Sequence, residues 1–488
     1  MYLGIDIGTS GVKAVLADDG GAVVEQAVIP LSVSRLHPLW SEQSPSDWWS
    51  ATERAVAALD PALRRKVRAI GLSGQMHGAV VLDASDKVLR PAILWNDGRA
   101  GPQCAQLLEL EPRTHTITGN PVVAGFTAPK LLWLARHEPE VFAAIRTVLL
   151  PKDWLRLMMT GEKLSDMSDA SGTLWLDVGA RDWSDAMLDA CGLSRAAMPG
   201  LVEGSAPAGR LTAKIAERWG MERVPVAGGA GDNAAGAIGL GVTHPGEAFL
   251  SLGTSGVIFS VSNGFQPDVS RGIHAFAHAL PDTWHRMTVM LSAAACLDWA
   301  ARVLAFPDVA ALLAQAEEAS VQPGVIFLPY LSGERSPHPD PDAQGVWFGM
   351  TSATTRADLA KAVLEGVAMG LRDGLDALEA GGDAIGELAM AGGGSRSMVW
   401  GQIIAAALGR PLVWRANAAV GPALGAAHLA RMAIDGVDTC PAAGPEISRI
   451  EPEARLAARM AEHQPRFRAL YTALKDHWIH DMPSDLRD

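Results

Sequence analysis

Eight residues near the beginning of the chain return half a chain later. Residues 6–13 read Asp-Ile-Gly-Thr-Ser-Gly-Val-Lys, and residues 251–258 read Ser-Leu-Gly-Thr-Ser-Gly-Val-Ile. The two copies start 245 positions apart in a chain of 488 residues, which is longer than one hydrophobic core normally supports. The repeat therefore predicts two large, related domains, each opening with a strand, a Gly-Thr-Ser-Gly turn and a second strand. We expect the boundary between them within residues 241–247.

Apolar runs separated by glycine turns predict an antiparallel β meander at the start of the chain. Further along, helical stretches alternate with short apolar strands, which is typical of the α/β class. The uncharged stretch 248–267 carries glycine, serine, threonine and asparagine throughout, so we interpret it as two strands around a turn and not as a membrane span. The predicted strands are residues 2–6, 12–17, 22–28, 69–72 and 92–95, and the predicted helices include 46–59 and 358–379.

The chain becomes more charged after Pro441. Residues 451–478 read as a helix interrupted at Pro465, because proline cannot donate the hydrogen bond that a helix interior needs. Its apolar side chains are available to dock on the preceding domain: Leu456, Met460, Phe467, Leu470 and Leu474. We therefore expect domains at residues 1–245 and 246–440, followed by a helical tail at 441–488.

Charge and cysteine content exclude several classes of protein. The formal net charge is -13, whereas a general nucleic-acid binder needs a surplus of lysine and arginine. Cys104, Cys191, Cys296 and Cys440 lie far apart without a CxxC pair, which is typical of reduced thiols in a cytosolic protein. The start of the chain lacks the basic and apolar regions of a signal peptide. We expect a cytoplasmic protein without nucleic-acid or membrane partners.

Each Gly-Thr-Ser-Gly turn places backbone N–H groups and two hydroxyls where a bulky anion can approach closely. One such motif alone is as often a plain hairpin turn, but two copies at half-chain spacing favour phosphate binding. Only the first copy carries a carboxylate, Asp6, where the second has Ser251. A carboxylate beside a phosphate cradle is a usual partner, directly or through water, of the Mg²⁺ that accompanies ATP in phosphoryl transfer. The predicted phosphate-binding residues are Gly8, Thr9 and Ser10 in the first turn and Gly253, Thr254 and Ser255 in the second.

A third glycine-rich turn follows an apolar strand within residues 388–397, and a helix is expected to begin near Met398. Such a turn lets a flat or anionic ligand reach the backbone, although glycine turns between a strand and a helix also serve close packing. Neither a dinucleotide fingerprint nor a P-loop fingerprint occurs at these turns.

Asp232 is the one carboxylate in the glycine-rich segment 227–236, which leads into a helix of small residues. The local pattern predicts that Asp232 caps the N-terminus of that helix. An alcohol that attacks phosphorus loses its proton to a carboxylate within hydrogen-bond reach. Capping and catalysis are compatible, so Asp232 is also our candidate base.

These motifs occur in the same order as in the FGGY carbohydrate kinases, which the chain resembles along nearly its whole length. The resemblance places a first phosphate motif at residues 6–13, a second at 251–256 and an adenosine motif at 391–397. It implies two actin-like domains of ribonuclease H type around a deep cleft, within the sugar kinase, actin and heat-shock chaperone superfamily. The first domain would hold mainly the sugar and the second mainly the nucleotide, and the two would close on substrate. Other matching segments are Ser41-Glu-Gln43, Gln75-Met-His-Gly78, Trp95-Asn-Asp-Gly-Arg99, Leu150-Pro-Lys-Asp153, Ser165-Asp-Met-Ser-Asp169 and Ser332-Gly-Glu-Arg335.

The resemblance also implies roles for single residues. Asp232 would be the base and, with Asp6, would be associated with the metal, while Met76, His77 and Asn233 would contact the sugar. A neutral imidazole beside methionine suits a polyol, although outside the family context His77 reads equally as a surface-loop histidine. The remaining implied site residues are Lys13, Thr254 and Ser255 along the phosphate path, Gly393, Gly394 and Ser395 at the adenosine, and Trp95, Asp97 and Arg99 at the sugar pocket. An Asp/Arg pair at a strand end is, however, more often a structural ion pair.

The same segments indicate which substrate the protein prefers. Glycerol kinases carry Arg-Glu where this chain has Met76-His77, and gluconate kinases share Met-His but differ after the tryptophan, where this chain reads Asn96-Asp-Gly-Arg99. The resemblance is greatest to members that phosphorylate D-xylulose, and it implies in-line transfer of the γ-phosphoryl of Mg-ATP to the C5 hydroxyl. A kinase for gluconate or ribulose, and a non-catalytic sugar-sensing regulator or assembly protein, remain as alternatives. A homodimer is a further expectation.

Of two segments after the adenosine motif, only the second matches the family pattern. Residues 402–407 read Gln-Ile-Ile-Ala-Ala-Ala, where the family commonly has an acidic residue, so nucleotide contacts near Ala406 are left open. Residues 421–427 read Gly-Pro-Ala-Leu-Gly-Ala-Ala and do match. Their small side chains let a helix approach the nucleotide or a neighbouring strand closely, and we expect packing to be their role.

Overall fold

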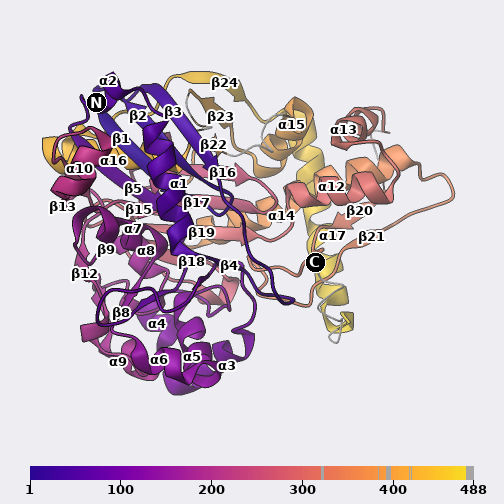
Figure 1. Ribbon diagram of the computed structural model, residues 1–488. Helices are drawn as coiled ribbons and strands as arrows, with labels where there is room; N and C mark the ends of the chain where they lie inside the picture. Colours follow the sequence, from indigo (N-terminus) through magenta and orange to yellow (C-terminus); the bar gives the residue numbers. More distant parts are fainter. Residues whose placement is uncertain (320–323, 383, 392–396, 417, 419, 480–488) are drawn as a thin grey trace.

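The computed structural model describes residues 1–319, 324–382, 384–391, 397–416, 418 and 420–479. It consists of two α/β halves joined between residues 240 and 248 (Figure 1). The elements of the first half are β1 (Tyr2–Ile7), β2 (Gly11–Ala17), β3 (Val23–Pro30), β4 (Glu42–Gln43), α1 (Pro45–Ala57), α2 (Pro61–Arg64), β5 (Ala69–Gly74), β6 (Val80–Leu82), β7 (Ala92–Ile93), α3 (Gly101–Leu110), α4 (Thr114–Thr118), α5 (Thr127–His137), α6 (Pro139–Ala144), β8 (Thr147–Leu149), α7 (Pro151–Thr160), β9 (Leu164–Asp166), α8 (Met167–Ser171), β10 (Leu176–Asp177), β11 (Asp182–Trp183), α9 (Asp185–Ala190), β12 (Gly200–Val202), β13 (Pro207–Arg210), α10 (Ala213–Trp219), β14 (Pro225–Ala227), β15 (Ala230–Gly231) and α11 (Asp232–Leu240). Those of the second half are β16 (Ala248–Leu252), β17 (Gly256–Ser262), β18 (His274–Ala277), β19 (Trp284–Met290), α12 (Ala294–Val303), α13 (Val309–Glu317), β20 (Ile326–Leu328), β21 (Val346–Phe348), α14 (Arg356–Ala380), β22 (Leu388–Ala391), α15 (Met398–Leu408), β23 (Leu412–Arg415), α16 (Pro422–Asp435), β24 (Glu446–Ile450) and α17 (Ala454–Leu474).

Each half is built on a seven-stranded sheet, and the two sheets share the arrangement of their central strands. The first runs β13-β14-β5-β1-β2-β3, with β15 also paired to β5, and the second runs β18-β19-β17-β16-β22-β23-β24. In both, the opening strand (β1 or β16) pairs with its hairpin partner on one side and with two parallel strands and an antiparallel edge strand on the other. They differ beyond the hairpin, because β17 pairs with β19 and β18 lies outside β19. The structure thus confirms the duplication and the α/β class that the repeated turn predicts.

The two repeated turns differ in register despite their shared sequence. In the first, Ile7 pairs with Val12, so that four residues form the loop, whereas in the second Leu252 pairs with Gly256 and only three do. As a result Asp6 lies opposite Lys13 in the first copy, but Ser251 lies opposite Val257 in the second. Local sequence therefore sets the presence of each hairpin but not its register.

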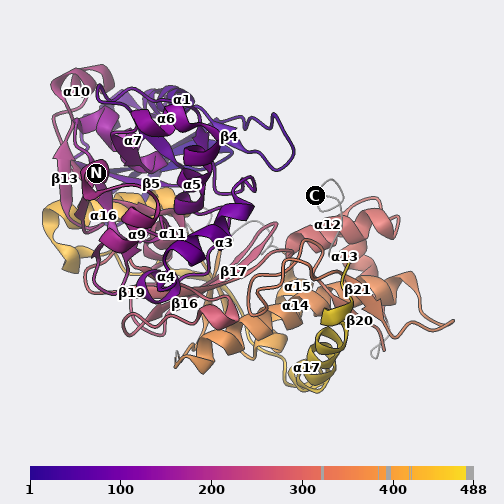
Figure 2. The same ribbon diagram turned by 90° about the horizontal axis from the view of Figure 1, so that it is seen from below.

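The two halves exchange a helix. From the first half, α11 contributes Ala237 to the core that contains Phe249 of β16. From the second half, α16 contributes Ala423 to a core with Tyr2 of β1. Both views show α16 beside the indigo strands of the first half, far from the rest of the orange second half (Figures 1 and 2). Residues 422–435 therefore pack on the first sheet although we expected them within the second domain, and the domain limits themselves remain a prediction.

Small residues make this exchange possible. A Cβ atom added to Gly4 of β1 would lie 1.8 Å from the carbonyl oxygen of Ala423, and one added to Gly71 of β5 would lie 1.8 Å from that of Ala426. A Cβ atom on Gly425 would lie 1.7 Å from the carbonyl oxygen of Ala235 in α11. The small residues of segment 421–427 therefore serve close packing, as expected.

Most helices between α3 and α9 contribute to a core shared with the second sheet, whereas α7 packs on the first sheet. Phe126 and Trp175 from this segment share one core with Phe259 of β17 and Phe276 of β18. The first half thus contacts the second sheet through a large apolar core as well as through α11.

The C-terminal tail differs from its prediction in two respects. β24 pairs with β23, so the tail completes the second sheet and is not helical throughout. The helix α17 runs through Pro465 without interruption, because Met460 and Phe467 on either side are buried in the core of the second half and hold it in place. The docking of its apolar face is confirmed.

In the described part of the chain, no helix combines the length and apolar character needed to cross a membrane. All four cysteines are unpaired, as predicted.

Replacing Gly425 with alanine should destabilise the protein, because the new methyl group cannot fit between α16 and the backbone of α11. Overpacking of this kind costs about 1–3 kcal/mol in free energy of unfolding. Gly101→Ala is the matched control, since a Cβ atom there meets nothing within 4 Å. Thermal and urea denaturation followed by circular dichroism would measure both variants. Equal midpoints would show that the helices do not cross this closely.

Candidate active site

Three strand ends of the first sheet meet at one edge. β1 and β5 run parallel, with Asp6 opposite Ser73, and β15 pairs in parallel with β5, with Gly231 opposite Gly74. Because the carboxyl ends of parallel strands lie at the same edge, Asp6 and the start of α11 are brought together there. The structure therefore assembles both predicted carboxylates, Asp6 and Asp232, from positions 226 residues apart.

Asp232 is the first residue of α11, and Gly231 takes the capping position that we predicted for Asp232. Gly231 is preferred there because a Cβ atom would lie 2.8 Å from the sulfur of Met76. The carboxylate instead accepts hydrogen bonds from the Asn233 backbone N–H at 2.7 Å and from its side-chain amide at 3.0 Å. Burial and the neighbouring Asp6 carboxylate raise the pKa of Asp232 to about 7, while the Asn233 N–H opposes them.

Asp6 has an oxygen available for a ligand. Burial raises its pKa, against the opposing effects of the Ser73 hydroxyl and the Lys13 ammonium. The Oδ1 atom is buried without a hydrogen-bond partner in the structure. A buried carboxylate oxygen in this state is costly unless something else binds it. The described residues contain no group of three or more histidine, cysteine or acidic side chains suited to a metal, so a cation here would need further ligands from outside the protein.

The first phosphate turn is held by side chains from three other segments. The Thr9 hydroxyl donates to Gln75 Oε1 at 3.1 Å and accepts from Trp95 Nε1 at 2.9 Å. Gln43 donates to the Thr9 carbonyl oxygen at 2.8 Å, and Gln75 donates to Gln43 at 2.9 Å. Trp95 remains 47% exposed, which leaves its ring surface available beside the turn. Ser10 is also exposed.

Gln43 and Gln75 were not assigned a role from the sequence. Both are buried, and each lies in a short segment that matched the family. The only available signal was that Gln75 directly follows the apolar strand β5, because a buried amide must find hydrogen-bond partners. The partner, Thr9, could not be inferred from spacing.

The second phosphate turn lies against the N-terminus of the helix α12. The carbonyl oxygen of Thr254 accepts from the N–H of Ala293 at 2.9 Å, and that of Gly253 accepts from the N–H of Ala294 at 3.0 Å. Gly253 and Thr254 are exposed, and Ser255 is partly exposed. These residues are thus accessible from solvent, and their contact with phosphate remains a prediction.

Other predicted cofactor residues are placed differently. Lys13 donates to the carbonyl oxygen of Val420 at 3.2 Å, immediately before α16. Its ammonium therefore links the two halves in this structure, and its contact with phosphate remains a prediction. Gly393, Gly394 and Ser395 of the adenosine motif lie outside the described residues.

His77 adopts a left-handed backbone conformation with φ of 68°, which directs its ring inward. Nδ1 lies 2.6 Å from the carbonyl oxygen of Gly172, so this nitrogen carries the proton and Nε2 is left as an acceptor. Burial lowers the pKa of His77 to about 3, which keeps the ring neutral. The ring centroid is 4.3 Å from that of Phe126. His77 is therefore a well-packed neutral imidazole and not a surface-loop histidine.

Asp97 and Arg99 form a buried structural pair. Arg99 Nη2 lies 2.7 Å from Asp97 Oδ2, and Arg99 Nη1 lies 2.7 Å from Glu42 Oε1. The N–H of Ser41 donates to Asp97 at 2.6 Å, and the Arg99 guanidinium lies 3.6 Å from the ring centroid of Trp40. With these groups already occupied, the geometry favours the ion-pair interpretation over contact with the sugar.

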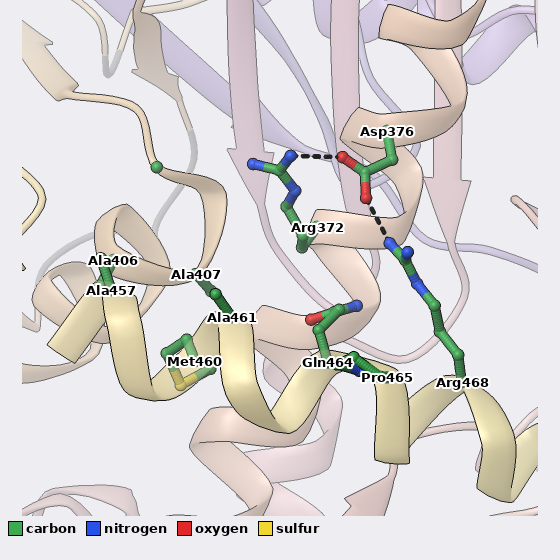
Figure 3. Close-up of a pocket in the computed structure, with 11 residues that line it drawn as sticks. Arg372, Asp376, Ala406, Ala407, Ala457, Met460, Ala461, Gln464, Pro465 and Arg468 are labelled. Carbon is green, nitrogen blue, oxygen red and sulfur yellow. Dashed lines mark hydrogen bonds and ion pairs between the residues drawn. The ribbon is translucent and has the colours of Figure 1, made fainter.

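A separate groove of about 400 Å³ lies between α14, α15 and α17 (Figure 3). Arg372 contacts Asp376 at 2.6 Å, and Arg468 pairs with both Asp376 and Asp373. These charges are therefore satisfied within the protein. Ala406, from the segment that lacks the family's acidic residue, lines this groove and faces the tail helix. The residues that line the groove therefore hold α17 against α14 and α15.

Comparison with known proteins adds independent findings. The model of the N-terminal domain of the FGGY family of carbohydrate kinases matches residues 1–239, and that of the C-terminal domain matches residues 248–434. Xylulose kinase of Escherichia coli (strain K12) is 54% identical over 97% of this chain and 99% of its own length. The crystal structure of a xyloylose kinase from Brucella ovis is 49% identical with a TM-score of 0.95, covering 97% of this chain and 99% of that chain. Xylulose kinase from Rhodospirillum rubrum is 32% identical with a TM-score of 0.91 at the same coverage.

Removing the Asp6 charge should lower the pKa of Asp232. Asp6→Asn abolishes the like-charge repulsion that favours the protonated form, so the carboxyl of Asp232 should titrate below its wild-type value of about 7. NMR titration of metal-free protein with ¹³C-labelled aspartate would measure this, with Asp232→Asn identifying the signal. Asp18→Asn, in the next turn of the meander, is the control and should leave the titration unchanged. An unaltered pKa in Asp6→Asn would show that the two carboxylates do not interact.

Proposed function

Because this chain belongs to the FGGY family of carbohydrate kinases, we propose that it transfers the γ-phosphoryl group of ATP to the C5 hydroxyl of D-xylulose, with Asp232 as general base. The relatives matched over nearly their full length are named xylulose kinases, which supports the substrate. The observation on this chain that carries the proposal is the meeting of Asp232, Asp6 and the first phosphate turn at one strand edge.

Asp232 is suited to act as the general base because its pKa lies near neutral pH. A carboxylate with a pKa of about 7 is largely ionised at slightly alkaline pH, yet it binds a proton more strongly than an exposed aspartate does. It would accept the proton of the sugar hydroxyl as that oxygen attacks phosphorus in line. Asn233 would then turn its amide from Asp232 to the sugar.

Met76 and His77 provide the sugar side of the site. The Met76 side chain packs against Gly231, directly before the base, and forms an apolar wall. The Nε2 atom of neutral His77 would accept a hydrogen bond from a sugar hydroxyl. Trp95 would present its exposed ring beside the phosphate turn, whereas Asp97 and Arg99 support the surrounding backbone.

Asp6 and Asp232 fit a magnesium ion as carboxylate ligands, directly or through water. The Oδ1 atom of Asp6 has no hydrogen-bond partner, and the pKa values of the Asp6 and Asp232 carboxyl groups are both raised. Both features are expected of neighbouring carboxylates whose negative charge a bound cation would neutralise. When bound, the ion would neutralise charge on the phosphates of ATP. The protein residues would supply its position.

The remaining assignments are also proposals. Gly8, Thr9 and Ser10 with Lys13, and Gly253, Thr254 and Ser255, would surround the phosphates, and Gly393, Gly394 and Ser395 would contact adenosine. Four unpaired cysteines suit the reducing cytoplasm, where we place the reaction. The homodimer and the three domain ranges stay predictions.

A coupled ADP-release assay with Mg-ATP tests the substrate against the alternatives. We expect kcat/KM for D-xylulose to exceed that for D-ribulose, L-ribulose, gluconate and glycerol by at least about tenfold, the factor expected from one or two lost polar contacts in the pocket. A preference for gluconate or ribulose would retain only the family-level function. Absence of turnover on every sugar would favour the non-catalytic regulator.

Asp232→Asn should lower kcat by about 10²- to 10⁴-fold, the usual contribution of a general base, while calorimetry shows that D-xylulose still binds. For the wild type, kcat/KM should fall as the pH drops through about 7, because protonated Asp232 cannot accept a proton. Asp185→Asn is the matched control, since Asp185 is also the first residue of a short helix, α9. Near-normal activity of Asp232→Asn would refute the assignment of the base.

A further inference from the structure

A fully buried cluster of charges lies behind the loop that carries Asp232. Lys152 Nζ lies 2.7 Å from Asp166 Oδ1 and 3.2 Å from Asp169 Oδ2, and it also contacts Asp153. Arg156 lies 3.7 Å from Asp153. All five side chains have no exposed surface. They come from the two segments around residues 150 and 165 that matched the family but received no role.

Such a cluster is poorly explained by stability alone. Removing charged groups from water costs several kcal/mol per ion, and buried ion pairs often contribute no more than apolar residues of the same size. What a buried cluster does provide is fixed geometry, because each group has only one arrangement that satisfies its charge. Its contacts with the surrounding backbone therefore indicate what it holds in place.

Two of these contacts reach the loop between β14 and α11. Arg156 donates to the carbonyl oxygen of Ala227 at 2.6 Å and also to that of Gly228. At the other end, the N–H of Gly231 donates to the Ser168 hydroxyl at 3.1 Å. The Ser168 hydroxyl in turn donates to Asp166 Oδ2 at 2.5 Å. The cluster thus holds both ends of the loop, and Gly231 directly precedes Asp232.

Ser168 belongs to α8, a helix of five residues whose other contacts also reach the site. Its C-terminal neighbour, Gly172, accepts the hydrogen bond from Nδ1 of His77. A Cβ atom on Gly172 would lie 2.6 Å from that nitrogen, so the fit is close. One short helix therefore contacts the backbone before the base and the side chain that faces the sugar.

We propose that Ser168 is a positioning residue for Asp232, and that Asp166, paired with Lys152, orients its hydroxyl. With its proton directed to Asp166, the Ser168 oxygen presents a lone pair to the Gly231 N–H. This fixes the first turn of α11 and aims the Asp232 carboxylate at the sugar hydroxyl. The inference rests on the proposed function, because the base has to be aligned for transfer.

Ser168→Ala tests the inference, with Ser165→Ala as the matched control. Ser165 is equally buried and donates to Asp153 of the same cluster at 2.6 Å, but the structure gives its hydroxyl no contact with the loop. Both variants should lose similar thermal stability. Only Ser168→Ala should lower kcat, by about 10- to 100-fold, because small misplacements of a reacting group have effects of that size. The KM for D-xylulose should change less than about threefold, since the sugar contacts remain.

Two further variants keep the test decisive. Ser168→Thr retains the hydroxyl and should recover kcat, whereas Asp166→Asn keeps Ser168 but replaces its charged acceptor and should lower kcat more than it raises KM. If Ser168→Ala fails to fold, these two variants decide the question. Equal kcat for Ser168→Ala and Ser165→Ala, or for Asp166→Asn and wild type, would overturn the inference.

Hydrogen exchange separates this inference from the function on which it rests. In Ser168→Ala, the peptide covering residues 227–236 should exchange faster than in wild type and in Ser165→Ala, because the Gly231 N–H loses its acceptor. Unchanged exchange would overturn the role of Ser168 even if the wild type phosphorylates D-xylulose. If exchange is faster in Ser168→Ala but the wild type phosphorylates no sugar, both the proposed function and the role of Ser168 in catalysis are overturned. The hydrogen bond from Gly231 to Ser168 would then be only a contact within the fold.

Discussion

The close crossing of α11 and α16 is the contact on which both halves depend. Gly425 brings α16 against the backbone of α11 at Ala235, and Gly4 and Gly71 let the same helix lie almost on the first sheet. A larger side chain at any of these positions would separate two elements that belong to different halves. Because Asp232 begins α11, its position is set by this crossing as much as by its own strand. A change in the angle between the helices would therefore move the carboxylate relative to the second phosphate turn.

Duplication supplies the frame of the site, and differences between the copies supply its chemistry. Both sheets begin with the same hairpin, but only the first has a carboxylate at the end of its opening strand, where Asp6 lies opposite Lys13. The second copy has Ser251 opposite Val257 and a turn one residue shorter. The first half thus provides carboxylates suited to bind a cation or accept a proton, and the second half presents hydroxyl and N–H groups to an anion.

The sequence predicted what local patterns determine. The repeat, the opening meander, the α/β class and the role of segment 421–427 in packing are all confirmed. The exchange of α16 was beyond reach, because small residues indicate close packing without naming the partner. Pro465 was expected to interrupt a helix, but burial of Met460 and Phe467 outweighs one missing hydrogen bond. The capping role predicted for Asp232 was wrong because α11 begins at Asp232 and Gly231 takes the capping position, where Met76, distant in sequence, packs closely against it.

Contacts with residues distant in sequence also distinguish two kinds of carboxylate near the site. Asp153 and Asp166 lie against Lys152 and also accept hydrogen bonds from serine hydroxyls, so their charge is fully used within the protein. Burial raises the pKa of Asp6 despite the opposing Lys13 ammonium, and burial together with the Asp6 carboxylate raises the pKa of Asp232. Their neighbours in the sequence do not tell these groups apart, since each pair contains one aspartate beside a small residue and one without, as Asp6 lies between two isoleucines and Asp153 between lysine and tryptophan. Their partners, brought from other strands and helices, make one pair structural and leave the other able to bind a proton or a metal ion.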